Sequence, residues 1–362
     1  MNGRSGTRGI DFVEVPAGHL DEVGISQDEV RLSGWMLWPK EPLLRLEVLL
    51  DGHSLGDALA KPRPDVARVH RWISHAGNTG FTFHRAVQIQ PGPSLREIEI
   101  RGAGRSGEMI SMVALWDSGC SSGQPVPPES LIKLIGSPDA SSYRSQGLKV
   151  FADITSAIRR YDDLDRFERV LDWGCGCGRL LTHLVSAFPE KTFGGCDLVP
   201  QAIEWCRERF PKGRFESVRP HPPTPFPEGS FDLVIASSVF THLDRDLQER
   251  WLDELSRVLQ AGGLVIASVL GEYAYLRDRC SGWRSWIPMW PSSSSARLRS
   301  RGILDQFRNN SLRDFVDSSY YRNTYQDAHY TIGKWSKHFR IRAYIERGLD
   351  NYQDLLVMQR IS

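Results

Sequence analysis

Short apolar runs alternate with stretches of helical spacing through the second half of the chain. The apolar runs end near Asp172, Asp197, Val218, Ser238 and Leu270. The helical stretches between them are Leu180–Phe188, Ala202–Phe210 and one whose apolar face carries Leu247, Trp251, Leu255 and Val258. Short apolar runs suit buried strands of a parallel sheet, and one-sided helices cover its faces. The pattern predicts an α/β fold with a Rossmann-like, doubly wound sheet.

The first third of the chain has strand-like patterns without helices. Leu46, Val48 and Leu50 lie on alternate positions, and Asp51-Gly52 follows as a hairpin signal. Several such short strands broken by turns predict a small all-β sandwich over residues 24–116, preceded by a loose lead-in over 1–23. Residues 117–130 are rich in Gly, Ser and Pro and form the predicted linker to a second domain over 131–362.

The run RVLDWGCGCGR at 169–179 places three glycines on alternate positions directly after a predicted strand. Asp172 comes just ahead of Gly174, Gly176 and Gly178. Glycines allow a tight turn whose backbone N–H groups approach a ligand, so the run predicts a strand–turn–helix that holds a nucleotide-like cofactor. A dinucleotide site needs a third glycine where Arg179 stands, which disfavours an NAD enzyme. A glycine-rich turn without a ligand is the alternative.

The pattern D-x-G-x-G-x-G resembles motif I of the class I S-adenosylmethionine-dependent methyltransferases, in particular the bacterial type 11 and type 12 enzymes. FDLVIASS at 231–238 and LSRVLQAGGLVIASVLG at 255–271 are similar to later segments of that family, so the resemblance covers roughly residues 140–271. It implies an enzyme that uses S-adenosyl-L-methionine as cofactor. Residues 321–360 resemble the tail of bacterial methyltransferases, which implies a seven-stranded sheet with an antiparallel last strand.

The resemblance also implies cofactor-binding positions. Asp197 would bind the ribose hydroxyls and Leu198 would pack on the adenine, unless Asp197 is a solvated surface residue. Prolines stand where the family has an acid that reads the adenine amino group, which leaves Glu216 and Ser217 as the nearest candidates. Tyr143 is a cofactor contact or a packing residue. The predicted cofactor residues are Tyr143, Asp172, Gly174, Cys175, Gly176, Gly178, Asp197, Leu198, Glu216, Ser217, Ser237, Ser238 and Val239.

Two histidines are candidates for a general base. A hydroxyl acceptor is a weak nucleophile, and a base that takes its proton contributes ~10²–10⁴-fold. His242 follows the fourth predicted strand, where ligands of a doubly wound sheet bind, and the ordinary pKa of a histidine lies near neutrality. A structural role is the alternative for His242. His329, which follows the predicted insertion over residues 271–328, is the second candidate.

Residues 271–328 lack a strand pattern and are predicted to be an insertion after the fifth strand. Long irregular segments in compact domains often serve function, so a substrate lid is expected, with a loosely packed surface excursion as the alternative. Arg297, Arg299 and Arg301 would pair with a phosphate or carboxylate of the acceptor, or be solvated.

Composition excludes several classes of function. The 362 residues carry a formal net charge of +1, which argues against a bulk electrostatic grip on nucleic acid. The start has no apolar signal segment, and no run of eighteen apolar residues predicts a membrane span. None of the six cysteines forms a C-x-x-C pair, so no metal site is predicted. Reduced thiols in a cytoplasmic protein are the simplest interpretation of these cysteines. The sequence leaves the oligomeric state open.

The predicted sandwich suggests an acceptor. GWMLWP, LLDGHSLG, KPRPDVA and TGFTF resemble an accessory β domain found beside bacterial glycosyltransferases and sugar-modifying enzymes. The aromatic residues Trp35, Trp38, His53, Trp72 and His75 would form a carbohydrate platform, or the tryptophans are core. The leading hypothesis is therefore methyl transfer to a hydroxyl of a saccharide or glycan precursor. The alternatives are a glycan-binding scaffold with an inactive methyltransferase domain, and a small-molecule or protein methyltransferase.

Overall fold

The chain divides into two compact units. A computed structural model describes residues 9–89, 95–117, 125–281, 293–308, 312, 314–315 and 320–361. One unit consists of residues 14–125 and 276–285, and the other of residues 1–13, 126–275 and 286–362. The division at 125 falls inside the predicted linker, of which residues 118–124 lie outside the described part.

Two four-stranded antiparallel sheets make up the N-terminal unit. Their strand orders are β2-β3-β7-β6 and β5-β4-β8-β9. Val30 and Phe81 of the first sheet and Val48 and Ile98 of the second belong to one buried cluster, so the sheets pack face to face as a sandwich. The elements are β2 (Ala17–Ile25), β3 (Glu29–Leu37), β4 (Leu43–Leu50), β5 (His53–Asp57), β6 (Leu59–Lys61), α1 (Pro64–Val69), β7 (Gly80–Ala86), β8 (Leu95–Gly104) and β9 (Met109–Asp117).

The predicted aromatic platform does not form one exposed face. Trp38 is only 2% exposed and belongs to the sandwich core, as the alternative interpretation had it. His75 lies beneath it, with Nε2 2.8 Å from the carbonyl oxygen of Trp38. Trp35 is half-buried and Trp72 exposed, and the ring of His70 lies between them at 5.7 and 5.6 Å.

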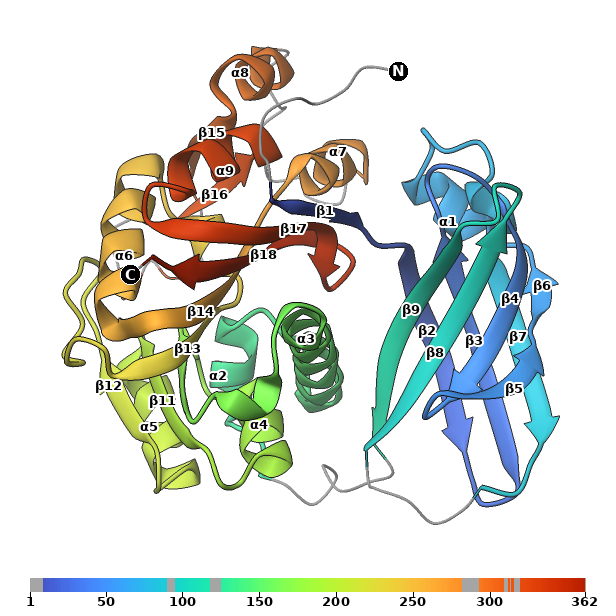
Figure 1. Cartoon of the computed structure of the whole chain (residues 1–362), viewed down its shortest axis with the longest axis horizontal. Coiled ribbons are helices and arrows are strands. Elements are labelled where there is room, and N and C mark those ends of the chain that lie inside the picture. Colours follow the sequence, from blue (N-terminus) through green and yellow to red (C-terminus); the bar gives the residue numbers. More distant parts are fainter. Residues whose placement is uncertain are drawn as a thin grey trace. The chain divides into compact units, whose positions relative to one another are not determined.

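An eight-stranded sheet forms the second unit, in the order β1-β17-β18-β14-β13-β10-β11-β12 (Figure 1). The strands β10 to β14 are parallel, and β18 runs antiparallel between β14 and β17. The predicted Rossmann-like sheet with an antiparallel last strand is therefore confirmed. The strands are β1 (Asp11–Glu14), β10 (Arg169–Trp173), β11 (Thr192–Asp197), β12 (Arg214–Ser217), β13 (Phe231–Ala236), β14 (Leu259–Val269), β17 (Phe339–Leu349) and β18 (Gln353–Arg360).

In its described part, residues 9–23, the predicted lead-in contains β1 and most of β2. β1 is an eighth, edge strand of the large sheet, and β2 opens the sandwich at Ala17. The sequence DFVE of β1 has four residues, of which only Val13 is buried. Such a short segment with one apolar position shows no alternating pattern that would predict a strand. β1 pairs with β17, whose backbone N–H and C=O groups would otherwise be unpaired at this edge of the sheet.

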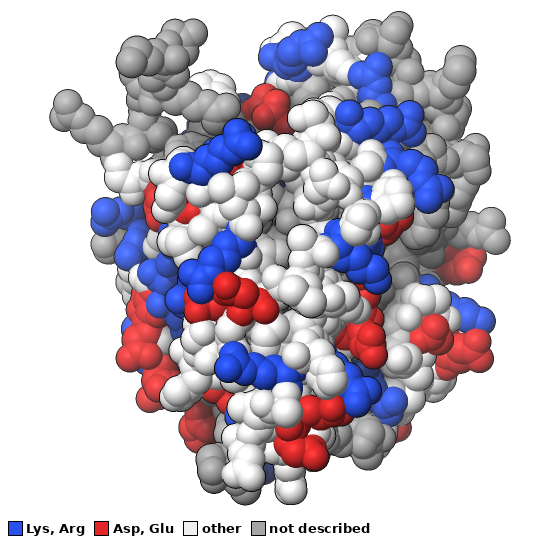
Figure 2. All heavy atoms as spheres, turned by 90° about the vertical axis from the view of Figure 1, so that its right-hand side faces the viewer, with Lys and Arg blue, Asp and Glu red and all other residues white. Residues whose placement is uncertain are grey.

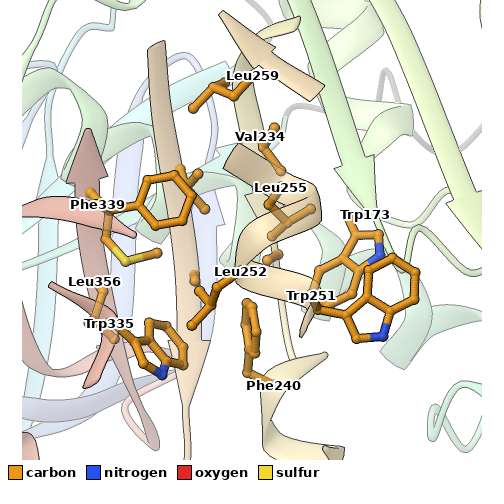
Figure 3. Packing of buried hydrophobic residues seen from close by; sticks show 14 of the residues in the cluster. Trp173, Val234, Phe240, Trp251, Leu252, Leu255, Leu259, Trp335, Phe339 and Leu356 are labelled. Atoms are coloured by element: carbon orange, nitrogen blue, oxygen red, sulfur yellow. The ribbon is translucent and has the colours of Figure 1, made fainter. Parts of the chain in front are cut away.

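Helices cover the sheet and fix the orientation of the loops at its edge. Figure 1 shows α3 and α6 on opposite sides of the sheet. Trp251, Leu252 and Leu255 of α6 pack against Val234 and Phe240 in the core drawn in Figure 3. Side-chain caps start α3, α6 and α9, where Asp139, Asp244 and Asp327 each accept a backbone N–H of the first turn. The helices are α2 (Glu129–Leu134), α3 (Ala140–Tyr161), α4 (Leu181–Ala187), α5 (Pro200–Arg209), α6 (Arg245–Val258) and α9 (Ala328–Trp335).

The insertion predicted over 271–328 contains sheet structure, which its sequence did not indicate. It comprises α7 (Glu272–Ser281), α8 (Ser293–Arg301) and the antiparallel pair β15 (Ile303–Arg308) and β16 (Arg322–Gln326). Partners from distant positions hold the pair, since Gln326 donates its backbone N–H to the carbonyl of Leu270 at 2.9 Å. Arg297, Arg299 and Arg301 are exposed on α8, and residues 282–292, 309–311, 313 and 316–319 lie outside the described part.

Charges of both signs are interspersed on the face shown in Figure 2. Among the described residues, short ion pairs join Arg45 with Asp57 at 2.8 Å and Arg31 with Glu29 at 2.7 Å. No helix within the described ranges is long and apolar enough to cross a membrane.

Candidate cofactor and active site

A cavity of about 320 Å³ opens where the parallel strands end. Ligands of doubly wound sheets bind at this edge. The predicted site residues that line it are Gly174, Gly176, Asp197, Leu198, Ser237, Ser238, Val239 and His242. The lining does not include Tyr143, Asp172, Cys175, Gly178, Glu216, Ser217 or His329.

The glycine turn is a tight backbone structure. Gly174 and Gly176 have φ of +77° and +52°, in the left-handed region that favours glycine. The N–H groups of Gly174 and Cys175 donate to the carbonyl of Cys196 at 2.8 and 3.1 Å, which ties the turn to the end of β11. A Cβ built on Gly174 would lie 2.4 Å from Cγ2 of Val239, so only glycine lets the turn approach Val239 this closely.

Cys175 and Gly178 shape the turn from behind. The Sγ of Cys175 lies 3.5 Å from the carbonyl of Gly176, and a Cβ on Gly195 would meet it at 2.8 Å. A Cβ on Gly178 would lie 2.6 Å from the ring of Phe210. Both residues are buried, and neither faces the cavity.

Asp197 connects the turn to the second strand. Its carboxylate accepts the N–H of Gly176 at 2.8 Å and that of Val199 at 2.9 Å. Burial raises the pKa of Asp197, and these two backbone donors oppose the rise. The side chain is therefore fixed at the cavity wall and is not a solvated surface group.

Asp172 lies behind the glycine turn and is 3% exposed. Burial, helped by the nearby charge of Asp197, raises the pKa of Asp172 to about 7, and Arg179 opposes the shift. The carboxyl group of Asp172, next to the turn, thus changes its charge near neutral pH.

Arg179 brings a positive charge to the cavity wall. Its Nη1 donates to Oε1 of Gln146 at 2.8 Å and to Oγ of Ser137 at 3.2 Å. Burial lowers the pKa of Arg179 from its ordinary value. In the sequence, Arg179 was only an argument against a dinucleotide site. No local pattern predicted that Gln146 and Ser137 are its hydrogen-bond partners.

Tyr143 has a packing role in the structure. It is 4% exposed, and its hydroxyl donates to the carbonyl of Cys177 at 3.1 Å. Burial raises the pKa of Tyr143, so the phenol stays protonated. The residue supports the glycine turn from α3 without lining the cavity.

The end of β12 places Val218, rather than Glu216 or Ser217, at the cavity. Glu216 pairs with Arg214 at 3.0 Å and with Arg207 at 3.5 Å, and Ser217 is exposed. The N–H of Val218 donates to the carbonyl of Asp197 at 3.0 Å. The position relative to the strand end decides this, because the cavity lies beyond the carboxyl ends of the strands and Val218 is the first residue after β12.

The two candidate bases have different surroundings. His242 lines the cavity, its ring stacks on Tyr321 at 4.1 Å, and Nδ1 lies 2.8 Å from the carbonyl of Arg322. A carbonyl only accepts, so Nδ1 carries the proton, and in the neutral ring Nε2 is the basic nitrogen. His329 is exposed in the first turn of α9.

Several cavity residues were missed by sequence reasoning. Trp173 and Trp251 lie at one wall, and Tyr320 and Tyr321 arrive from the end of the insertion. Tyr321 falls within the family-like tail over residues 321–360, but no local signal in the sequence tied Tyr320 or Tyr321 to the cavity. Trp251 is 1% exposed, and no partner of its indole N–H was found in the described part of the chain.

The donor set fits S-adenosyl-L-methionine. Asp197 offers a carboxylate for the ribose hydroxyls, Leu198 and Val218 offer apolar surface for the adenine, and Arg179 offers a cation for a carboxylate. The buried indole N–H of Trp251 is a further donor at the wall. Among the described residues, no group of three or more His, Cys, Asp or Glu side chains is placed to hold a metal ion.

The sheet order, the glycine turn and Asp197 define a Rossmann-like nucleotide-binding domain. Residues 170–263 match the family model described as "Methyltransferase domain". This segment is therefore a methyltransferase domain of the class I type, and S-adenosyl-L-methionine is its cofactor, as predicted.

Named proteins similar to this chain include enzymes with different acceptors. The fatty-acid O-methyltransferase of Mycolicibacterium smegmatis is 34% identical over 100 residues, which are 26% of this chain and 35% of that protein. The tRNA N(3)-methylcytidine methyltransferase Mettl2 of Drosophila melanogaster is 30% identical over 113 residues, 29% and 35% of the two chains. The chain thus spans about a third of the length of these relatives. An S-adenosylmethionine-dependent methyltransferase from Mesorhizobium loti has 18% identity and a TM-score of 0.41, covering 58% of this chain and 98% of its own.

Proposed function

We propose that the whole chain is an S-adenosyl-L-methionine-dependent O-methyltransferase. The observation that carries the proposal is His242, which lines the cofactor cavity with Nδ1 held by the carbonyl of Arg322. The tautomer fixed by this bond makes Nε2 the basic nitrogen, and a basic nitrogen is what a hydroxyl acceptor requires.

The donor half of the site binds and orients. S-adenosyl-L-methionine supplies a methyl group on a positively charged sulfur, which needs no polarisation by the protein. Asp197 would hold the ribose hydroxyls, and Arg179 the carboxylate of the methionine part. Because Gln146 and Ser137 hold Arg179 in place, little side-chain entropy remains to be lost on binding.

The other half of the site would receive the acceptor. His242, Tyr321 and Ser238 lie together on the cavity wall beyond the glycine turn. Nε2 of His242 would take the proton that the acceptor hydroxyl loses as its oxygen forms the new bond to carbon. Holding the reacting atoms at about 3–3.5 Å contributes several kcal/mol, and the rigid stack of His242 on Tyr321 supports such positioning.

The acceptor is proposed to be a hydroxyl compound with an apolar body. Trp173, Trp251, Tyr320 and Tyr321 give the cavity aromatic walls. Such walls accept the apolar face of a saccharide as well as an acyl chain or a phenol. The relative named for fatty-acid O-methylation supports an oxygen acceptor. A saccharide, which the sequence of the N-terminal unit suggests, is therefore one of the acceptors to be tested.

Two measurements test the proposal. Calorimetry should find binding of S-adenosylhomocysteine, and its absence at millimolar ligand would refute the cofactor site. Labelled methyl donor is then offered with a hydroxylated saccharide, a fatty acid, a phenol and tRNA. Label on an oxygen of one of the first three supports the proposal. Label only on tRNA, or on none with the ligand bound, overturns it, and the latter favours the inactive glycan-binding scaffold.

A further inference from the structure

Ser238 has a strained backbone at the cavity wall. Its φ is +60°, in the left-handed region that L residues other than glycine rarely adopt. It is the second residue after the end of β13 and lines the cavity together with His242. Strain of this kind persists only where surrounding contacts impose it, and it concentrates at functional sites.

A closed ring of hydrogen bonds imposes this conformation. The N–H of Ser238 donates to Oγ of Ser268 at 2.7 Å, and that hydroxyl donates to Oε1 of Gln353 at 2.7 Å. Nε2 of Gln353 donates back to Oγ of Ser238 at 2.8 Å. The three residues lie at the ends of β13, β14 and β18, which neighbour one another in the sheet.

The direction of each bond follows from burial. Ser268 is fully buried, and in this arrangement its oxygen accepts one hydrogen and its proton is donated to Gln353. Turning the amide of Gln353 over would make Ser268 accept twice and take away the acceptor of its proton. Ser238 therefore enters the ring as an acceptor, and its own hydroxyl hydrogen lies outside the ring.

The ring also fixes the turn that carries His242. Oγ1 of Thr241 donates to the carbonyl of Ser238 at 2.8 Å, and the N–H of His242 donates to the carbonyl of Val239 at 3.0 Å. Rotating the backbone of Ser238 would thus move both its hydroxyl and the base. Gln353, 115 residues further along the chain, contacts the cavity-lining residue Ser238 through its amide.

We propose that Gln353 and Ser268 are positioning residues for methyl transfer, which hold Ser238 so that its hydroxyl donates a hydrogen bond to the acceptor oxygen beside His242. This inference rests on the proposed methyltransferase function. It assigns to Ser238 the orientation of the acceptor, and to Gln353 and Ser268 the orientation of Ser238.

The first test compares Gln353→Leu with the matched variant Gln359→Leu. Gln359 lies on the same strand, and its amide donates to the carbonyl of Gly262, away from the ring. Gln353→Leu should raise the hydrogen-exchange rate of the 237–243 segment at least tenfold, with the melting temperature and the affinity for S-adenosylhomocysteine close to wild type. Unchanged exchange would overturn the ring, and this readout needs no catalysis.

The second test separates positioning from general structural damage. Gln353→Leu should lower kcat at least tenfold with KM for S-adenosyl-L-methionine within threefold, whereas Gln359→Leu should match wild type. Ser238→Gly relieves the strained φ but lacks the hydroxyl, so it should lose as much as Gln353→Leu, and the double variant no more. Additive losses would show that Gln353 does not act through Ser238. Wild-type inactivity on every acceptor would refute the proposed function, while the exchange result still decides whether the ring exists.

Discussion

The two halves of the cavity are built in different ways. In the proposed donor half, Gly176 and Asp197 are 21 residues apart, and the backbone N–H of Gly176 donates to the carboxylate of Asp197. In the proposed acceptor half, the carbonyl of Arg322 holds the ring of His242 from 80 residues away, and the amide of Gln353 holds Ser238 from 115 residues away. The first half can be recognised from a local pattern, whereas the second depends on strands that meet only in the finished sheet.

This difference has a functional meaning. A backbone turn recognises a part of the cofactor that does not vary, so a short run of glycines suffices. Side chains contributed by distant elements can change one at a time, which allows a domain of one fold to serve different acceptors.

The largest expected effect lies in the acceptor half. His242→Ala should lower kcat by ~10²–10⁴-fold, because it removes the proposed base, and should leave the affinity for S-adenosylhomocysteine within threefold. Steady-state kinetics and calorimetry measure the two. His329→Ala, on the exposed start of α9, is the matched control and should stay within twofold of wild type. Equal losses in both variants would contradict the assignment of the base.

Asp197→Ala tests the donor half. The substitution removes the carboxylate that would bind the ribose hydroxyls. Hydrogen bonds to a charged group contribute about 1.5–3 kcal/mol, so the affinity for S-adenosylhomocysteine should fall about 10- to 100-fold. Asp165→Ala, which replaces an exposed aspartate in the short helical turn before β10, serves as the control. Unaltered affinity in a folded Asp197→Ala protein would remove Asp197 from the site.

The pH dependence of binding sharpens the role of Asp172. The pKa of Asp172 is about 7 in the free protein, and a bound cationic cofactor would lower it. Binding then releases a proton, so the affinity for S-adenosyl-L-methionine should rise with pH up to about 7, by at most about tenfold per unit, and stay level above it. Calorimetry from pH 5.5 to 8.5 measures the slope. Asp172→Asn should abolish it, and a persistent slope would assign the proton to another group.

The smallest effect is expected from the cysteine inside the glycine turn. Cys175 was predicted to be a cofactor residue, but its side chain is buried beside Gly195, outside the cavity lining. Cys175→Ala should therefore change the affinity for S-adenosylhomocysteine less than threefold in a calorimetric titration. A larger loss, without a lower melting temperature, would place Cys175 in the site.

Much of the fold followed from local patterns because each strand and helix carries its own period. The glycine turn, the strand ending at Asp197 and the apolar face of α6 were recognisable in this way. β1 and the β15–β16 pair were missed, since their pairing depends on partners distant in sequence and not on a period of their own. Glu216 and Ser217 were predicted because they are the polar residues nearest to the prolines that replace the family's acid, whereas the residue at the cavity is Val218, just past the end of β12.

By itself, the sequence determined the class of domain and the cofactor, because the glycines, Asp172 and Asp197 lie in one strand–turn–helix–strand segment whose geometry the backbone sets. Only the tertiary structure decided how Arg179 is held, that Tyr320 and Tyr321 reach the cavity, and that Ser268 and Gln353 hold Ser238. The physical reason is that a hydrogen bond between side chains needs both partners within about 3 Å. For residues 30 to 115 positions apart, that proximity exists only once the sheet has formed.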